Sequence, residues 1–199
     1  MQKDFTLYIQ NSWEWFRQKS QTKAAQVWLG LYSFFESVIL PFPTDVFLAL
    51  MVLAHRARVI RFVVITTVSG VLGAVFLYVA TTLFYTAILE PLVISLGWQS
   101  AIMHASETIQ DYTFLATFIG AFSPIPYTPV IIAAGLLRAD FISFLFASIV
   151  GRGLRYVIVA TLVYFLGEPI LRVLSRYVAL ITLGVVIAFT AVVFFVVNL

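Results

Sequence analysis

The sequence predicts an all-α integral membrane protein with two opposed re-entrant helical hairpins in an inverted repeat, about three full transmembrane helices and an N-terminal interfacial helix. Composition is the first observation behind this prediction: of 199 residues, 62% are hydrophobic and 11% charged, which is far outside the range of soluble domains. The second is a proline pair within each of two apolar segments, namely Pro41 and Pro43 in residues 31–53, and Pro124 and Pro126 in residues 113–137. In lipid, such a break is tolerated only where the backbone is buried in protein or lines a polar cavity.

The basic residues indicate how the first broken segment lies in the membrane. Lys19 and Lys23 precede it, and Arg56, Arg58 and Arg61 follow it. A complete crossing would put these two clusters on opposite sides, against the positive-inside rule. A hairpin that enters and leaves on one side keeps both clusters, and the N-terminus, in the cytoplasm. Two interrupted segments at matching positions of two half-chains are typical of a transporter binding site.

The remaining elements follow in chain order. Residues 1–26 are predicted to form an amphipathic helix at the membrane surface, with a soluble arm as the alternative. Residues 62–85 and 141–166 are apolar runs long enough to span about 30 Å of hydrocarbon, and the acidic residues 86–112 are predicted to connect them outside the cytoplasm. The core is assigned to residues 27–176, followed by a last spanning helix over 177–199.

Four ionisable residues fall at the predicted depth of the hydrocarbon: Glu36, Asp45, Arg152 and Arg155. Each costs about 2.5–3.5 kcal/mol at a helix centre, so such residues are expected to face the protein interior and pair. Arg152 and Arg155 share one helical face, and guanidinium groups can bind carboxylate or phosphate oxygens through two hydrogen bonds. Two interpretations stay open: a structural ion pair that docks the first hairpin, or a site for substrate and protons.

Residues near the two breaks form a second candidate group. The hydroxyl groups of Tyr127 and Thr128 can either satisfy freed backbone carbonyls or contact a ligand. His55 is interpreted as interfacial, and His104 and Glu107 as loop residues. The predicted hairpin-tip residues are Pro41, Pro43, Pro124, Pro126, Tyr127 and Thr128.

Several functional classes find no support in the sequence. There is no cysteine and only two isolated histidines, so no metal site is predicted. No catalytic motif is present, so the protein is predicted not to be an enzyme and to use no cofactor. The basic residues fit topology signals rather than a nucleic-acid surface. The expected partners are membrane lipids and protons, and a homo-oligomer is compatible with this prediction.

Four short motifs resemble those of a known membrane family. They are Phe-Glu-Ser with Pro-x-Pro-x-Asp at 35–45, Phe-Ser-Pro-Ile-Pro-Tyr at 122–127, Ala-Gly at 134–135, and Gly-Arg-Gly-Leu-Arg-Tyr at 151–156. Together they resemble the YqaA branch of the DedA family, also called SNARE-associated or VTT-domain proteins, over roughly residues 24–170. The resemblance implies a bacterial inner-membrane protein with two opposed re-entrant hairpins. Several family members translocate lipids, including undecaprenyl phosphate and phospholipids, and some are linked to the proton-motive force.

The resemblance also implies roles for individual residues. Glu36 and Asp45 look like the acidic pair regarded as essential in DedA proteins. Two arginines that better-studied members place around the second hairpin's proline correspond here to Ala121 and Tyr127. This departure bears on phosphate-carrier specificity, although Arg152 and Arg155 can supply positive charge from the following helix.

The expected function is translocation of a lipid with an anionic, phosphate-type headgroup, coupled to protons through Glu36. A proton-coupled transporter of a small solute or ion is one alternative, and it predicts a closed water-filled path. A non-transporting envelope-homeostasis factor is the other, and it predicts that Arg155→Ala damages folding without a separable activity.

Overall fold

The computed structural model describes residues 22–39, 44–95, 99–123 and 127–167. Across these ranges all regular structure is helical. The predicted helices over 1–26 and 177–199 lie almost wholly outside the described residues, as do the four prolines at the breaks. The elements are α2 (Lys23–Val38), α3 (Thr44–Ala54), the 3-10 helix η1 (Arg56–Arg58), α4 (Val59–Phe84), the π-helix η2 (Tyr85–Leu89), α5 (Glu90–Ser95), α6 (Gln99–Phe122), α7 (Thr128–Leu136) and α8 (Phe141–Leu166).

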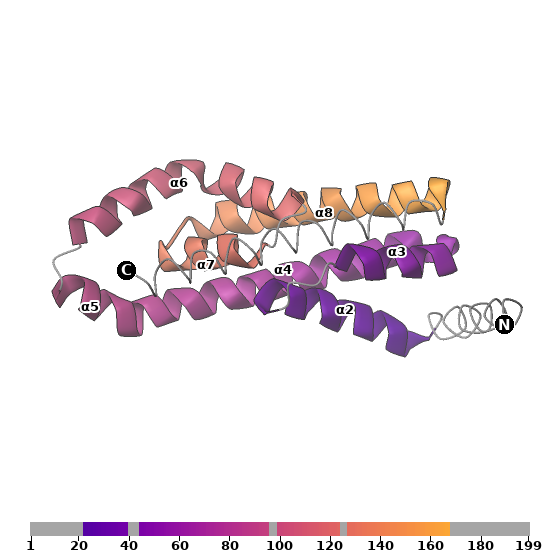
Figure 1. The fold of residues 1–199 in the computed structure, drawn as a ribbon, viewed down its shortest axis with the longest axis horizontal. Coiled ribbons are helices and arrows are strands. Elements are labelled where there is room, and N and C mark those ends of the chain that lie inside the picture. The colour runs from indigo at the N-terminus through magenta and orange to yellow at the C-terminus, as the bar shows by residue number, and fades with distance from the viewer. Residues whose placement is uncertain (1–21, 40–43, 96–98, 124–126, 168–199) are drawn as a thin grey trace, which may run out of the picture.

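The chain reverses direction at both breaks (Figure 1). Helices α2 and α3 run in opposite directions, and so do α6 and α7, while the helix ends that flank each break lie near the middle of the molecule. The helix ends beside the two breaks are in contact: the hydroxyl of Thr128, at the start of α7, lies 3.3 Å from the backbone carbonyl oxygens of both Glu36 and Ser37 near the end of α2. Each break therefore forms the turn of a helix pair, and the turn ends of the two pairs meet.

Two helical stretches are long and apolar enough to cross a membrane. They cover Arg56–Ala87, 32 residues that contain α4, and Phe141–Leu166, 26 residues that form α8. Many of their outward-facing side chains are large and apolar, with Ile60 77% and Phe165 76% exposed. An apolar outer surface of this extent fits a protein surrounded by lipid. The third predicted spanning helix, over 177–199, is outside the described residues.

The two halves of the chain pack according to the same scheme. Each long helix packs along the first helix of the pair that precedes it in the chain, α4 on α2 and α8 on α6. Each also packs on the second helix of the other pair, so that α4 contacts α7 and α8 contacts α3. The long helices themselves lie side by side and run in opposite directions (Figure 1). Neither half is a separate unit, because each supplies a helix to the packing of the other.

Small residues allow α2 to lie close to α4. A Cβ atom added at Gly73 would lie 3.0 Å from the Cβ of Ser37 and 3.1 Å from the backbone carbon of Phe34. The close approach lets serine hydroxyls of α2 donate to backbone carbonyls of α4: Ser33 to Thr66 at 2.8 Å and Ser37 to Gly70 at 2.9 Å. Small residues and hydrogen bonds between helices are the usual means of helix association in lipid.

The structure corrects the prediction for residues 86–112. This range was expected to be a connection, but η2, α5 and most of α6 fall within it. His104 and Glu107 lie inside α6 rather than in a loop. Pro91 is the second residue of α5. Because α5 continues from α4 through η2 without a gap, this proline lies inside a helical run, and its missing N–H removes one helical hydrogen bond directly after the π-helix. The true connection between helices is therefore much shorter than predicted.

Other boundaries differ less. The first helix pair begins at Lys23 and ends at Ala54 rather than spanning 31–53, and α4 begins three residues before position 62. Helix α8 has the predicted bounds, because both of its ends carry strong local signals. The Asp140 carboxylate accepts a 2.7 Å hydrogen bond from the Ser143 backbone N–H at the first turn, and Gly167 follows the last turn with a positive φ of 68°.

Asp140→Ala is expected to lower the unfolding temperature by a few degrees at pH 7, because the N-cap of α8 is lost. The backbone N–H of Ser143, and then its side chain, hydrogen-bond the carboxylate and lower the pKa of Asp140 from 3.8. A lowered pKa gives stabilisation that is present above pH 3.8 and is lost as the pH falls through the folded value. The measurement is thermal unfolding of the wild-type protein and the Asp140→Ala variant in detergent across this pH range. The difference between their unfolding temperatures should become smaller as the pH falls. A difference that does not change with pH would contradict a charged cap at Asp140.

Candidate functional site

The four predicted charges come together beside the break of the first helix pair. Glu36 lies two residues before the end of α2, and Asp45 is the second residue of α3. Arg152 and Arg155 face them from the middle of α8. Each acid has one arginine, so that Glu36 pairs with Arg152 and Asp45 with Arg155. We call these four residues the charge cluster.

The pair of Asp45 and Arg155 is the tighter of the two. The Nε atom of Arg155 lies 3.1 Å from both carboxylate oxygens of Asp45, and its Nη2 atom also binds Oδ2. The side chains are only 5% and 13% exposed. The guanidinium fork thus holds the carboxylate through two nitrogens, the strongest geometry for such a pair.

Arg155 also binds the second helix pair. Its Nη1 atom donates to the backbone carbonyl of Ser123, directly after the last residue of α6. Carbonyls at a helix C-terminus have no partner within the helix, so the arginine satisfies one of them. One side chain of α8 therefore holds the start of α3 and the end of α6 together.

Glu36 is held more loosely. Its Oε2 atom accepts a 2.7 Å hydrogen bond from the hydroxyl of Thr44, whereas Nη2 of Arg152 is 3.4 Å away and the hydroxyl of Tyr156 is 3.5 Å away. Its side chain is 15% exposed. Beside it, Phe35 of α2 is 45% exposed, and Ile39, which directly follows α2, is 71% exposed. The carboxylate therefore lies just beneath an apolar surface.

Arg152 is buried and has an unused donor. Its residue exposure is 3%, and its guanidinium carbon lies 5.3 Å from the ring centre of Tyr127, a cation–π contact. Nη1 lies 3.3 Å from the hydroxyl of Tyr156, but Nε finds no hydrogen-bond partner among the described residues. Gly70 of α4 makes room for this head group, because an added Cβ would collide with Nη1. Buried donors rarely stay unpaired in proteins.

The two hydroxyls at the second break have different partners. The Thr128 hydroxyl bonds backbone carbonyls of α2, which matches the alternative in which it satisfies carbonyls freed at a break. The Tyr127 hydroxyl lies 2.7 Å from that of Ser148. His55 directly precedes η1. It lies after the last residue of α3, whereas Asp45 of the charge cluster lies in the first turn of that helix.

Three residues of the site were not predicted from the sequence. Thr44 and Tyr156 contact Glu36, and Gly70 leaves space for Arg152. A signal for Tyr156 was available, because it lies four residues after Arg152 and so shares its helical face. The contact of Thr44 depends on how the chain turns between α2 and α3, which spacing does not reveal.

The site offers hydrogen-bond and charge chemistry rather than metal ligation. Within the described residues, no group of three histidine, cysteine, aspartate or glutamate side chains could hold a metal ion. The two guanidinium groups now hold carboxylates, and the same donors fit the oxygens of a phosphate. The charge cluster therefore contains donors of the kind that bind oxyanions.

Comparison with known proteins gives one family. The sequence model of the VTT domain matches residues 40–165, which include Asp45, Arg152 and Arg155. An uncharacterized protein of Haemophilus influenzae is 28% identical over 93% of this chain and 94% of its own length. An uncharacterized homologue from Histophilus somni is 26% identical over 85% and 88%. No solved structure matches.

The family match extends over most of the fold that positions the charge cluster. It begins within the break between α2 and α3 and ends one residue before the end of α8. The narrower placement in the YqaA branch stays a prediction. Since the matched residues make up more than half of the chain, this protein belongs to the VTT domain family, the family also known as DedA.

Proposed function

We propose that the protein translocates a lipid with an anionic, phosphate-type headgroup across the bacterial inner membrane, and that Glu36 couples this movement to protons. Membership of a transporter-like membrane family supports the general class. The observation that carries the specific proposal is the state of Arg152, a buried guanidinium whose Nε donor has no hydrogen-bond partner among the described residues and whose Nη2 atom lies 3.4 Å from the Glu36 carboxylate. Such a group can accept an oxyanion without first breaking a tight pair.

The exchange follows from charge balance. A phosphate that binds Arg152 takes the place of Glu36, whose carboxylate would then remain in an apolar region without a counter-ion. Proton uptake removes that charge, and proton release restores the pair with Arg152 after the headgroup has left. Thr44 and Tyr156 lie within hydrogen-bond distance of Glu36, so they can hold its side chain in both states.

The surroundings of Glu36 favour a lipid over a small solute. Phe35 and Ile39 expose apolar side chains beside it, so an approach from the membrane plane passes hydrocarbon first and then the carboxylate. A headgroup attached to acyl chains can use such an approach, because the chains stay in the lipid. A small hydrophilic solute would instead need a continuous aqueous path.

The proposed membrane arrangement has both helix pairs as re-entrant hairpins that enter from opposite faces. The start of α2 and the basic residues of η1 lie at one end of the molecule, and α5 lies at the other (Figure 1). With the positive-inside rule, the end that carries η1 faces the cytoplasm, and so does the N-terminus. The repeated packing scheme of α4 and α8 supports an inverted repeat.

Glu36→Gln is expected to lower translocation at least tenfold and to abolish its dependence on a pH gradient, because glutamine keeps the shape of glutamate but cannot exchange a proton. The measurement is the flux of fluorescent phosphatidylglycerol in vesicles that contain the purified full chain, with and without the gradient. Glu90→Gln is the matched control, since Glu90 forms an exposed ion pair with Arg138 at 2.6 Å and should transport normally.

Two outcomes would contradict the proposal. Flux of the Glu36→Gln variant that still follows the pH gradient would exclude Glu36 as the coupling residue. Absence of flux in the wild-type protein for both anionic and neutral lipids, with normal folding, would favour the envelope-homeostasis alternative.

A further inference from the structure

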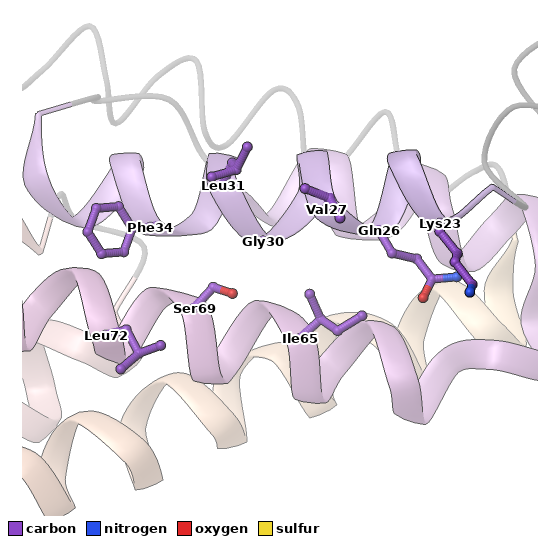
Figure 2. Close-up of a pocket in the computed structure, with 9 residues that line it drawn as sticks. All are labelled: Lys23, Gln26, Val27, Gly30, Leu31, Phe34, Ile65, Ser69 and Leu72. Carbon is purple, nitrogen blue, oxygen red and sulfur yellow. The ribbon is translucent and has the colours of Figure 1, made fainter.

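An apolar groove lies between α2 and α4, apart from the charge cluster (Figure 2). Its volume is about 490 Å³. None of the four charged residues of the cluster lines it. Apolar side chains make up most of its walls, and two polar side chains lie at one end. The lining residues are Lys23, Gln26, Val27, Gly30, Leu31, Phe34, Ile65, Ser69 and Leu72.

The groove exists because the two helices approach closely along its floor. A Cβ at Gly30 would lie 2.9 Å from the Ser69 hydroxyl, so the backbones lie near each other at this level. Larger apolar side chains of both helices, such as Leu31 of α2 and Leu72 of α4, are among the lining residues (Figure 2). The groove follows the two helices from the level of Lys23 to that of Phe34 (Figure 2).

The length of the groove matches one leaflet of a bilayer. Lys23 and Phe34 mark its ends on α2, and eleven helical residues rise about 16 Å. Half of a hydrocarbon core of about 30 Å is nearly the same length. An acyl chain that enters beside Lys23 would therefore end near Phe34, at the depth where the two helix pairs meet.

The polar end of the groove is positively charged. Lys23 is exposed there, and the first turn of α2 contains no acidic residue. The N-terminus of a helix adds a partial positive charge, and none of the described residues that line the groove is acidic. The basic residues of η1 lie at the same end of the molecule (Figure 1). This end is complementary to an anionic headgroup.

We propose that this groove is a binding site for a phospholipid with an anionic headgroup, held in place rather than transported. One acyl chain lies along Val27, Leu31 and Leu72, while the Lys23 amine and the Gln26 amide bind the phosphate. The site shares no residue with the charge cluster, so it goes beyond the proposed translocation. It requires only that the chain lies in a bilayer.

Photolabelling tests the proposal in nanodiscs of phosphatidylcholine that contain the full chain. The probe is phosphatidylglycerol with a diazirine on its acyl chain, and labelled residues are mapped by mass spectrometry. Saturable labelling is expected on Val27, Leu31 and Leu72. Unlabelled phosphatidylglycerol should compete with it, and a phosphatidylcholine probe should not reproduce it.

Matched variants separate headgroup from chain binding. Lys23→Gln should weaken the saturable labelling about fivefold, the effect of one lysine near an anionic lipid, whereas Arg61→Gln, exposed on α4 but outside the groove, should change it far less. Leu31→Trp should abolish it by filling the groove. Phe146→Trp, 58% exposed on α8, should leave it intact.

Three results would overturn the proposal. One is labelling that does not saturate, and another is equal labelling by the neutral probe. The third is a groove without label while other exposed faces are labelled, which would mean that another part of the chain or a second copy covers it. Glu36→Gln should keep wild-type labelling, so failure of the groove site and failure of the transport proposal give different results.

Discussion

Arg155→Ala is expected to leave little folded protein. The substitution strands Asp45, whose side chain is only 5% exposed, and removes the donor to the Ser123 carbonyl. Loss of one partner of a buried ion pair destabilises by about 3–5 kcal/mol, a large share of the roughly 5–15 kcal/mol that separates folded from unfolded proteins. Size-exclusion chromatography and thermal unfolding in detergent would measure the loss.

A double variant distinguishes a structural from a transporting role of this pair. Asp45→Leu with Arg155→Met removes both charges together, and replacement of a buried pair by apolar residues is often neutral or stabilising. We expect this variant to be clearly more stable than Arg155→Ala, although it still lacks the donor to the Ser123 carbonyl, and not to transport. Arg138→Ala is the control, because its ion pair with Glu90 is 45% and 38% exposed and contributes about 0–1 kcal/mol.

The single and double variants also show how the interpretation can fail. A stable Arg155→Ala variant would mean that the pair is not buried in the protein as described. Wild-type flux in the folded double variant would mean that Asp45 and Arg155 only dock α3 on α8, the structural interpretation raised by the sequence.

Gly73→Ala should destabilise the protein by about 1–3 kcal/mol, the usual cost of overpacking. The added methyl group would meet the carbonyl oxygen of Phe34 and lie 3.1 Å from its carbon. A backbone atom cannot rotate away as a side chain does, so α2 as a whole must move from α4. That movement would weaken the bond between the Ser37 hydroxyl and Gly70 and displace Glu36, so that transport falls together with the unfolding temperature.

Gly153→Ala provides the matched comparison. Its added Cβ would lie 3.7 Å from the nearest atom, a methyl carbon of Thr67, which is an ordinary contact. Alanine is also preferred over glycine within a helix, so this variant should be as stable as wild type or slightly more stable. Equal destabilisation by both substitutions would contradict a special close approach at Gly73.

Local signals explain what the sequence could predict. The bounds of α8 follow from a capping aspartate before it and a glycine after it. The meeting of Glu36 and Asp45 with Arg152 and Arg155 follows from the cost of unpaired charges in hydrocarbon. The first inference uses signals that act within one helix. The second uses only the need of each buried charge for a partner of opposite sign.

Non-local geometry limits the rest. Which acid pairs with which arginine depends on the approach of α2 and α3 to α8, and that approach depends on glycine contacts with another helix. The packing of α7 on α4 likewise joins residues far apart in the chain, such as Thr82 and Gly135, whose hydrogen bond is 3.0 Å long. The helical character of residues 99–110 was missed because acidic residues and a nearby glycine are common both in loops and at helix starts.

The exchange of helices between the two halves has a consequence for biosynthesis. Asp45 leaves the ribosome 110 residues before Arg155, and at about 5–20 residues per second the delay is roughly 5–20 s. Throughout that interval Asp45 lacks Arg155, the guanidinium with which it pairs in the folded protein. The packing of α3 on α8 and the pairing of Asp45 with Arg155 can therefore form only after α8 has been made, so the first half of the protein reaches its final packing only when the second half is present.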